Sequence, residues 1–157
     1  MRGPCICSFI TLIGTVSITE DGEGRITGVY LPSSNLPPMD DEETDPLSEA
    51  GLQLNEYLAG KRREFDLDIH YTGTEFRMAV MEEIRRIPYG EVRTYKEIAT
   101  AVGSPNSSRA VGNVCAENPL PIIVPCHRVV PSTGGYGYYE GGTALKRRLI
   151  EHEGSQS

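Results

Sequence analysis

The residues of this chain best suited to chemistry are three consecutive reactive side chains, Cys126, His127 and Arg128. Cysteine is a strong nucleophile only as the thiolate, and its free pKa of about 8.5 falls beside a histidinium or an arginine. Pro125 fixes φ and removes a backbone donor just before the thiol, which stiffens the chain there. Because three reactive residues interrupt an apolar run, we interpret Cys126 as a nucleophile rather than as a buried cysteine of a core strand.

A base for this thiol cannot simply be its neighbour in an extended chain. Successive side chains of a strand point to opposite sides, so a direct pair of Cys126 and His127 is not expected. The alternative is a relay through water, with a carboxylate that orients the imidazole. Glu151 or Glu153 could supply that carboxylate. Whether Arg128 lowers the thiol pKa or braces the fold stays open from the sequence alone.

The first half of the chain has the pattern of a small antiparallel sheet with one helix. Period-2 alternation and a Gly-rich turn predict a β meander over 8–34. Asp45 is expected to cap a helix that ends at Gly60. Alternation over 65–69 predicts one more strand that returns to the sheet. The fold class is therefore α+β, with a strand-rich N-terminal domain over 1–72.

The second half, 73–157, is predicted to be a mostly helical domain. Thr74 can cap a first helix. Thr94, with a glutamate three residues later, forms a capping box at the start of a second. A Gly-bearing turn then leads to a third helix that runs to Ala116. The second and third helices suggest a helix-turn-helix over about 94–117, although core helical hairpins have the same pattern.

Three further features of this half could contribute to binding a partner molecule. Arg109 lies in the first turn of the third helix, where the dipole disfavours a cation, which favours a DNA contact. The loop 132–142 combines Gly with Tyr and could cradle a planar ring. A last helix over 144–153 is expected to carry Lys146, Arg147 and Arg148 outward and Leu145 and Leu149 inward.

Net charge and cysteine content limit the classes of protein to which the chain could belong. The net charge of −7 is concentrated in residues 1–74, which carry 13 acidic and 5 basic side chains, whereas residues 75–157 carry 9 and 10. A local basic face can still meet phosphate. Four cysteines are too few for a disulfide scaffold, and none has zinc-ligand spacing. No segment approaches the ~18 apolar residues of a membrane span. We expect a cytoplasmic protein with no metal, no cofactor and no membrane contact.

The motif around the thiol resembles a known signature. Residues 125–129, Pro-Cys-His-Arg-Val, with Asn-Pro-Leu-Pro-Ile at 118–122, are similar to the signature of the O6-alkylguanine-DNA alkyltransferases, or methylated-DNA–protein-cysteine methyltransferases. The resemblance covers about residues 73–154. The other matching segments are 73–76, 87–92, 94–95, 109–112, 141–142 and 152–154.

This resemblance implies direct-reversal DNA repair by a monomer with a ribonuclease-H-like N-terminal domain. The family binds duplex DNA from the minor groove, flips the damaged guanine out, and moves its O6-alkyl group once to the position of Cys126. By the same resemblance, His127 draws the thiol proton through water, Glu153 orients it, Tyr95 protonates the leaving base and Asn118 braces the turn. DNA contacts are expected at Thr94, Tyr95, Lys96, Ser104, Arg109, Ala110, Gly112, Arg128 and Ser132, with Arg109 filling the vacated space. The base pocket is expected at Val129, Tyr139 and Glu140.

Several positions depart from the family, and three different functions compete with it. Glu140 stands where a serine is common in the family, which leaves the preferred size of the alkyl group open. Whether O4-alkylthymine is a substrate is also open. Cys115 and Ala116 replace a frequent apolar wedge and a basic residue. A related group carries Trp in place of the acceptor and only flags damage, which Cys126 argues against. A Cys–His hydrolase would need an oxyanion hole, and none is evident, while a DNA-binding regulator would keep the cysteine as a structural residue.

Overall fold

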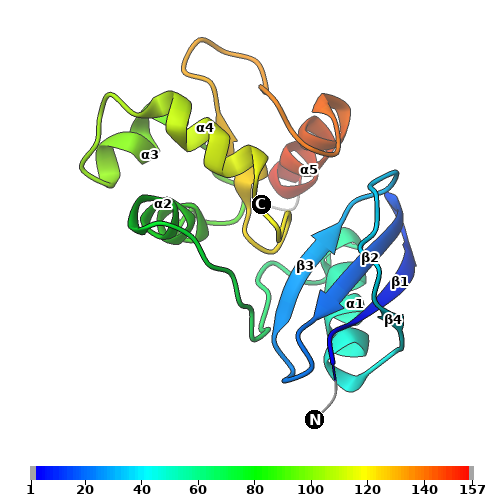
Figure 1. Cartoon of the computed structure of the whole chain (residues 1–157). Coiled ribbons are helices and arrows are strands. Elements are labelled where there is room, and N and C mark those ends of the chain that lie inside the picture. The colour runs from blue at the N-terminus through cyan, green and yellow to red at the C-terminus, as the bar shows by residue number, and fades with distance from the viewer. Residues whose placement is uncertain (1–2, 156–157) are drawn as a thin grey trace. The chain divides into compact units, whose positions relative to one another are not determined.

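The computed structural model describes residues 3–155 and has a mixed α+β fold (Figure 1). The chain divides into two compact units, Met1–Tyr71 and Thr72–Ser157. Each unit has its own buried apolar residues.

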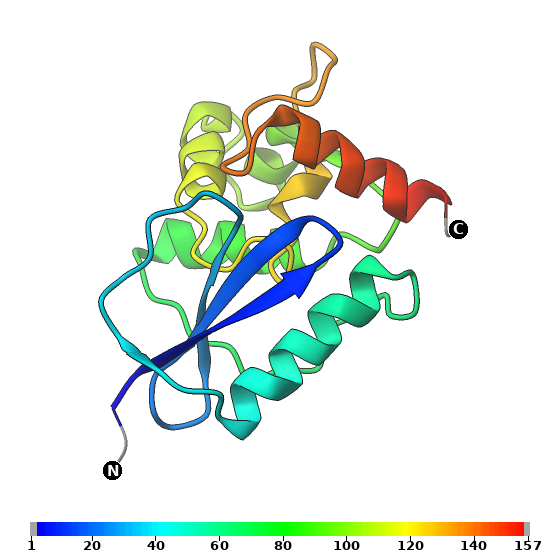
Figure 2. The same ribbon diagram turned by 90° about the vertical axis from the view of Figure 1, so that its right-hand side faces the viewer.

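The first unit is a four-stranded sheet with one long helix. Its elements are β1 (Cys5–Thr11), β2 (Gly14–Glu20), β3 (Ile26–Tyr30), β4 (Asp40–Asp41) and α1 (Asp45–Leu58). The strand order is β3-β2-β1-β4, antiparallel except for the short parallel pairing of β4 with β1. Helix α1 runs along one face of this sheet (Figures 1 and 2). The β meander predicted from the alternating pattern is thus confirmed.

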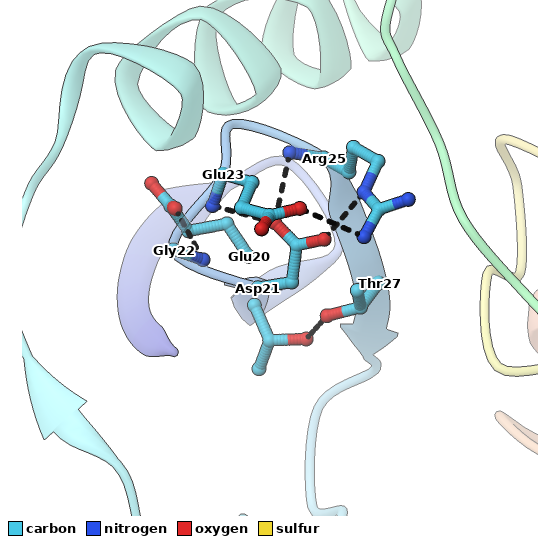
Figure 3. A network of polar contacts seen from close by, with 7 residues as sticks. Glu20, Asp21, Gly22, Glu23, Arg25 and Thr27 are labelled. Atoms are coloured by element: carbon cyan, nitrogen blue, oxygen red, sulfur yellow. Dashed lines mark hydrogen bonds and ion pairs between the residues drawn. The ribbon is translucent and has the colours of Figure 1, made fainter. Parts of the chain in front are cut away.

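The turn between β2 and β3 is closed by its own side chains (Figure 3). Asp21 Oδ1 accepts hydrogen bonds from the backbone N–H groups of Glu23 at 2.8 Å and Arg25 at 3.2 Å. Its Oδ2 accepts from Arg25 Nε at 2.6 Å. Gly22 and Gly24 take φ values of 89° and 88°, which only glycine adopts at little cost. These local contacts set where β2 ends and β3 begins.

Two expectations for this unit were wrong in detail. Helix α1 is capped by Thr44, whose side chain accepts from the N–H of Leu47, and Asp45 is the first helical residue. The strand expected over 65–69 is reduced to one parallel bridge between Ile26 and Ile69.

The strand is lost because a helix side chain takes the place of a strand partner. The buried Gln53 of α1 donates to the Asp66 carbonyl at 3.0 Å and accepts from the Asp66 N–H at 2.9 Å. This amide satisfies the backbone that a ladder would otherwise have paired.

The second unit is mostly helical. Its elements are α2 (Glu75–Arg85), β5 (Arg93–Thr94), α3 (Tyr95–Ala101), α4 (Ser108–Ala116), a 3₁₀ turn η1 (Cys126–Arg128), β6 (Val129–Val130) and α5 (Thr143–Ser155). The two-residue strands β5 and β6 pair in parallel. Its core is formed by Val80, Met81, Ile84, Ile98, Val111, Leu120, Val124 and Leu149.

Helix starts in this unit follow the predicted caps. The Thr74 side chain accepts from the Arg77 N–H at the start of α2. Thr94 and Glu97 form the reciprocal capping box of α3. Both predictions are confirmed, because a cap depends only on residues within one turn. Among residues 3–155, no helix is long and apolar enough to cross a membrane.

Candidate active site

The reactive triplet forms a tight turn instead of a strand. Cys126, His127 and Arg128 make up η1, entered from Pro125 at φ −80° and ψ 61°. Successive side chains of a 3₁₀ turn diverge by about 120°. The extended conformation assumed for this stretch is therefore wrong: the thiol lies against Asn118, whereas His127 and Arg128 both reach Glu153. All three residues are buried.

Asn118 holds the thiol and the loop before it. Its Nδ2 donates to Cys126 Sγ at 3.1 Å and to the Val124 carbonyl at 2.9 Å. Its Oδ1 accepts from the Leu120 N–H at 2.9 Å. Ile122, inside this loop, has φ of 76°, an unusual value for a β-branched residue. The buried amide of Asn118 thus braces a strained loop beside the thiol, which is the role that the family resemblance implied for it.

The thiol is neutral in the resting protein. Burial raises the pKa of Cys126 to about 11, although the Asn118 hydrogen bond and the charge of Lys146 lower it, and the charge of Glu140 raises it. The sequence left open whether Arg128 lowers this pKa, and in the structure the side chains of His127 and Arg128 are both directed to Glu153. A thiolate therefore has to be generated during reaction.

His127 and Glu153 form a buried pair. His127 Nε2 lies 2.7 Å from Glu153 Oε2, and neither residue has more than 1% of its surface exposed. Burial lowers the pKa of His127, against the opposing effect of the Glu153 hydrogen bond. A neutral ring that donates from Nε2 to the carboxylate keeps its lone pair on Nδ1. Of the two candidate carboxylates, Glu151 is on the surface and pairs with Arg147 at 2.9 Å.

Arg128, which we expected to contact DNA, is buried and makes its hydrogen bonds within the protein. Its Nε and Nη2 donate to the two oxygens of Glu153 at 2.8 and 3.0 Å. Its Nη1 donates to the Ile87 carbonyl at 2.7 Å, and the guanidinium lies 5.6 Å from the centre of the Tyr89 ring. Glu153 also accepts from the Gly90 N–H at 3.1 Å. This network joins η1, α5 and the turn after α2, so Arg128 braces the fold.

Lys146 is a site residue that the sequence analysis missed. We expected it to point outward, but it is only 1% exposed. Its Nζ donates to the Tyr95 hydroxyl at 3.3 Å and to the Tyr138 carbonyl at 3.4 Å. Burial lowers the pKa of Lys146 and raises that of Tyr95 to about 12. The spacing held a signal: Lys146, Leu149 and Glu153 fall three and four residues apart, on one helix face.

A groove of about 890 Å³ runs beside this cluster. Five predicted contact residues line it: Tyr95, Lys96, Arg109, Gly112 and Ser132. The groove is also lined by three residues of the loop 132–142, Thr133, Gly137 and Tyr138, and by Ser108, Asn113, Ala116 and Pro131. A Cβ atom on Gly112 would lie 3.8 Å from the Tyr95 ring, an ordinary contact distance, so this position of α4 packs beside Tyr95 and would also accept alanine.

The remaining predicted residues lie outside the groove lining. Thr94 is occupied as the cap of α3, and Ser104 Oγ bonds Ser107 Oγ at 2.5 Å. Val129 is fully buried, and Tyr139 is 5% exposed. Glu140 is exposed in the turn before α5. Ala110 is half-buried on α4. Their contacts with DNA or with a base stay predictions.

Comparison with known proteins shows the family to which the chain belongs. Residues 75–155 match the family model described as 6-O-methylguanine DNA methyltransferase, DNA binding domain. The chain belongs to the DNA-repair family of methylated-DNA–protein-cysteine methyltransferases. It is 41% identical over 151 residues to the constitutive methylated-DNA–protein-cysteine methyltransferase of Bacillus subtilis, covering 91% of both chains. Its identity to the enzyme of that name from Methanosarcina acetivorans is 39% over 150 residues, covering 94% and 96%.

The fold is shared with solved structures of this family. The crystal structure of Mycobacterium tuberculosis OGT in complex with DNA superposes with a TM-score of 0.90 at 35% sequence identity. That alignment covers 98% of this chain and 94% of the other. The family resemblance inferred from the residues around Cys126 is thereby confirmed.

Proposed function

We propose that this protein repairs duplex DNA by moving the alkyl group of an O6-alkylguanine to Cys126 once. The observation that supports this best is the thiol, which Asn118 contacts at 3.1 Å, next to His127, whose ring pairs with the buried Glu153 of α5. A new S–C bond forms as the C–O6 bond breaks. The products are a thioether at Cys126 and an unmodified guanine, so each molecule acts once.

The proton balance uses the groups around the thiol. His127, with its lone pair on Nδ1, takes the thiol proton through a water, and Glu153 stabilises the imidazolium that results. The Tyr95 hydroxyl gives its proton to the leaving base. Lys146 donates to the Tyr95 oxygen at 3.3 Å and stabilises the phenolate as it forms. With a pKa raised to about 12, Tyr95 keeps its proton until the base accepts it.

The groove is the proposed DNA-binding surface. In this proposal α3 and α4 act as a helix-turn-helix over about 94–117 that enters the minor groove, and Arg109, exposed at the start of α4, fills the space of the flipped guanine. Extrusion costs a few kcal/mol, less for a poorly paired lesion. Lys96, on the same groove, contacts phosphate.

The proposal extends to the organisation of the chain. Residues 1–72 form a ribonuclease-H-like domain and residues 73–157 the alkyltransferase domain, which is supported by the β meander with α1 on one face and by the position of the thiol network. In this proposal the protein acts as a monomer in the cytoplasm. It needs no metal or cofactor, because its own cysteine accepts the alkyl group.

The test is intact mass after incubation with a short duplex that holds one O6-methylguanine. We expect a stoichiometric gain of one methyl group for one hydrogen, lost in Cys126→Ala and Cys126→Ser. Cys115→Ser is the matched control, because Cys115 is the thiol of α4 and its loss leaves the acceptor in place. Tight lesion-selective binding without a mass change would instead make this a damage-recognition protein.

A further inference from the structure

Tyr138 is an exposed aromatic residue that lines the groove beside the active-site cluster. It has 65% of its surface exposed, whereas every other tyrosine and phenylalanine among residues 3–155 is buried or half-buried. A single exposed aromatic ring is ordinary on a protein surface. What distinguishes Tyr138 is its place in the groove, where a large, planar and mostly apolar surface is available to a ligand.

The main chain that carries this ring is held in place on both sides. The Lys146 ammonium donates to the Tyr138 carbonyl at 3.4 Å. On one side Gly137 has φ of 75°, and a Cβ atom there would lie 3.0 Å from Pro131 Cγ, so glycine suits this close contact. On the other side Tyr139 is 5% exposed. Binding therefore has to order little besides the two side-chain torsions of Tyr138, which keeps its entropic cost low.

The charge of the groove fits a polyanion. Its lining comes from two parts of the chain: α3 and α4 contribute Lys96 and Arg109, and the segment 131–138 contributes Tyr138. None of the described residues that line the groove is acidic, although the whole chain has a net charge of −7. Basic side chains next to an exposed aromatic ring are a combination that binds nucleic acid with accessible bases, because the cations meet the phosphates and the ring stacks on a base.

We propose that Tyr138 is a DNA-binding residue whose ring stacks on a base that is unstacked when the damaged guanine is extruded. The inference rests on the proposed function, in which a guanine leaves the duplex at this groove. Extrusion breaks the stacking of that guanine and of its neighbours. In a fully paired duplex the faces of each internal base are covered by neighbouring bases, so the ring has no face to contact there. Tyr138 therefore adds to the selectivity for poorly paired, damaged sites, from which a base is extruded more easily.

The test measures equilibrium binding to two duplexes of one sequence, one with a central O6-methylguanine and one with guanine at that position. All proteins carry Cys126→Ser, so that no alkyl group is transferred during the measurement. The variants compared are Tyr138→Ala, which removes the ring, and Tyr138→Phe, which keeps it. Tyr136→Ala is the matched control, because Tyr136 belongs to the same loop but is not among the groove-lining residues. Both duplexes are titrated across a salt series, and the melting temperature of each variant shows that it is folded.

We expect Tyr138→Ala to weaken binding to the damaged duplex about fivefold or more, the loss that removal of one stacked ring causes. Binding to the undamaged duplex should change by less than about twofold, because its bases offer no free face, and the salt slope should stay the same, because no phosphate contact is lost. Tyr138→Phe and Tyr136→Ala should stay within about twofold of the parent protein on both duplexes.

Equal weakening on both duplexes, with a salt slope lower by about one, would mean that Tyr138 contacts a phosphate and would overturn the inference. The inference also fails if Tyr138→Ala leaves the affinity for the damaged duplex unchanged, or if Tyr138→Phe or Tyr136→Ala weakens it as much as Tyr138→Ala does. Absence of methyl transfer from O6-methylguanine by the wild-type protein would instead refute the proposed function, which stands if transfer occurs and only the role of Tyr138 fails.

Discussion

Replacing Arg128 by methionine should destabilise the fold far more than it weakens DNA binding. The guanidinium makes three hydrogen bonds, two to Glu153 and one to the Ile87 carbonyl, and its side chain is 9% exposed. Methionine fills a similar volume but donates none of them. The variant therefore leaves the carboxylate of Glu153 buried without its cation.

The size of the effect follows from what Glu153 retains. Removing one partner of a buried ion pair costs about 3–5 kcal/mol. Glu153 keeps its hydrogen bonds from His127 and from the Gly90 N–H, so we expect the lower end, about 3 kcal/mol. For a chain of this length each kcal/mol shifts the melting temperature by about 2–4 °C, which predicts a fall of roughly 6–12 °C.

Thermal unfolding gives the shift, and hydrogen exchange of α5 locates it. Binding to an undamaged duplex across a salt series is measured alongside, at a temperature where both proteins are folded. Arg109→Ala is the matched control, because Arg109 is exposed and lines the groove. It should keep the wild-type melting temperature and weaken binding.

The opposite pattern would refute this reasoning. If Arg128→Met melted within about 1 °C of the wild-type protein and its salt slope fell by about one phosphate contact, the side chain would be reading DNA as first expected. Arg128→Lys should be intermediate in stability, because one ammonium group cannot donate to both Glu153 oxygens and to the Ile87 carbonyl with the geometry of the guanidinium.

Three further predictions concern the chemistry of the thiol. Lys146→Met removes the hydrogen-bond donor to Tyr95 and a positive charge that lowers the pKa of Cys126. The rate of single-turnover methyl transfer should therefore fall about 10- to 100-fold, which corresponds to the loss of one hydrogen bond from a charged group. A rate within about twofold of the wild-type value would contradict the role given to Lys146. Because burial raises the pKa of Cys126 from 9.0 to about 11, its alkylation by iodoacetamide, followed by peptide mass, should rise about tenfold per pH unit up to pH 10. A rate that levels off near pH 9 would show that the pKa of the Cys126 thiol is not raised. The same shift stabilises the fold below pH 9, where the thiol is neutral in both states, and this contribution is lost as the pH rises toward 11.

The amino-acid sequence alone determined the features that depend on near neighbours. The caps at Thr74 and Thr94 and the β meander each rest on residues within a few positions along the chain. Cys126 was also recognisable as a candidate nucleophile, because a cysteine beside His127 and Arg128 in a Pro-rich segment is an unusual local grouping. The family followed from that grouping and its flanking motifs.

Only the tertiary structure decided which way the charged side chains face. Arg128 was expected on DNA and Lys146 in solvent, and both are buried. Their partners are far along the chain: Glu153 is 25 residues from Arg128, and Tyr95 is 51 residues from Lys146. A buried charge is stable only if folding brings it a partner. That condition is met by packing between distant segments, which no local pattern contains.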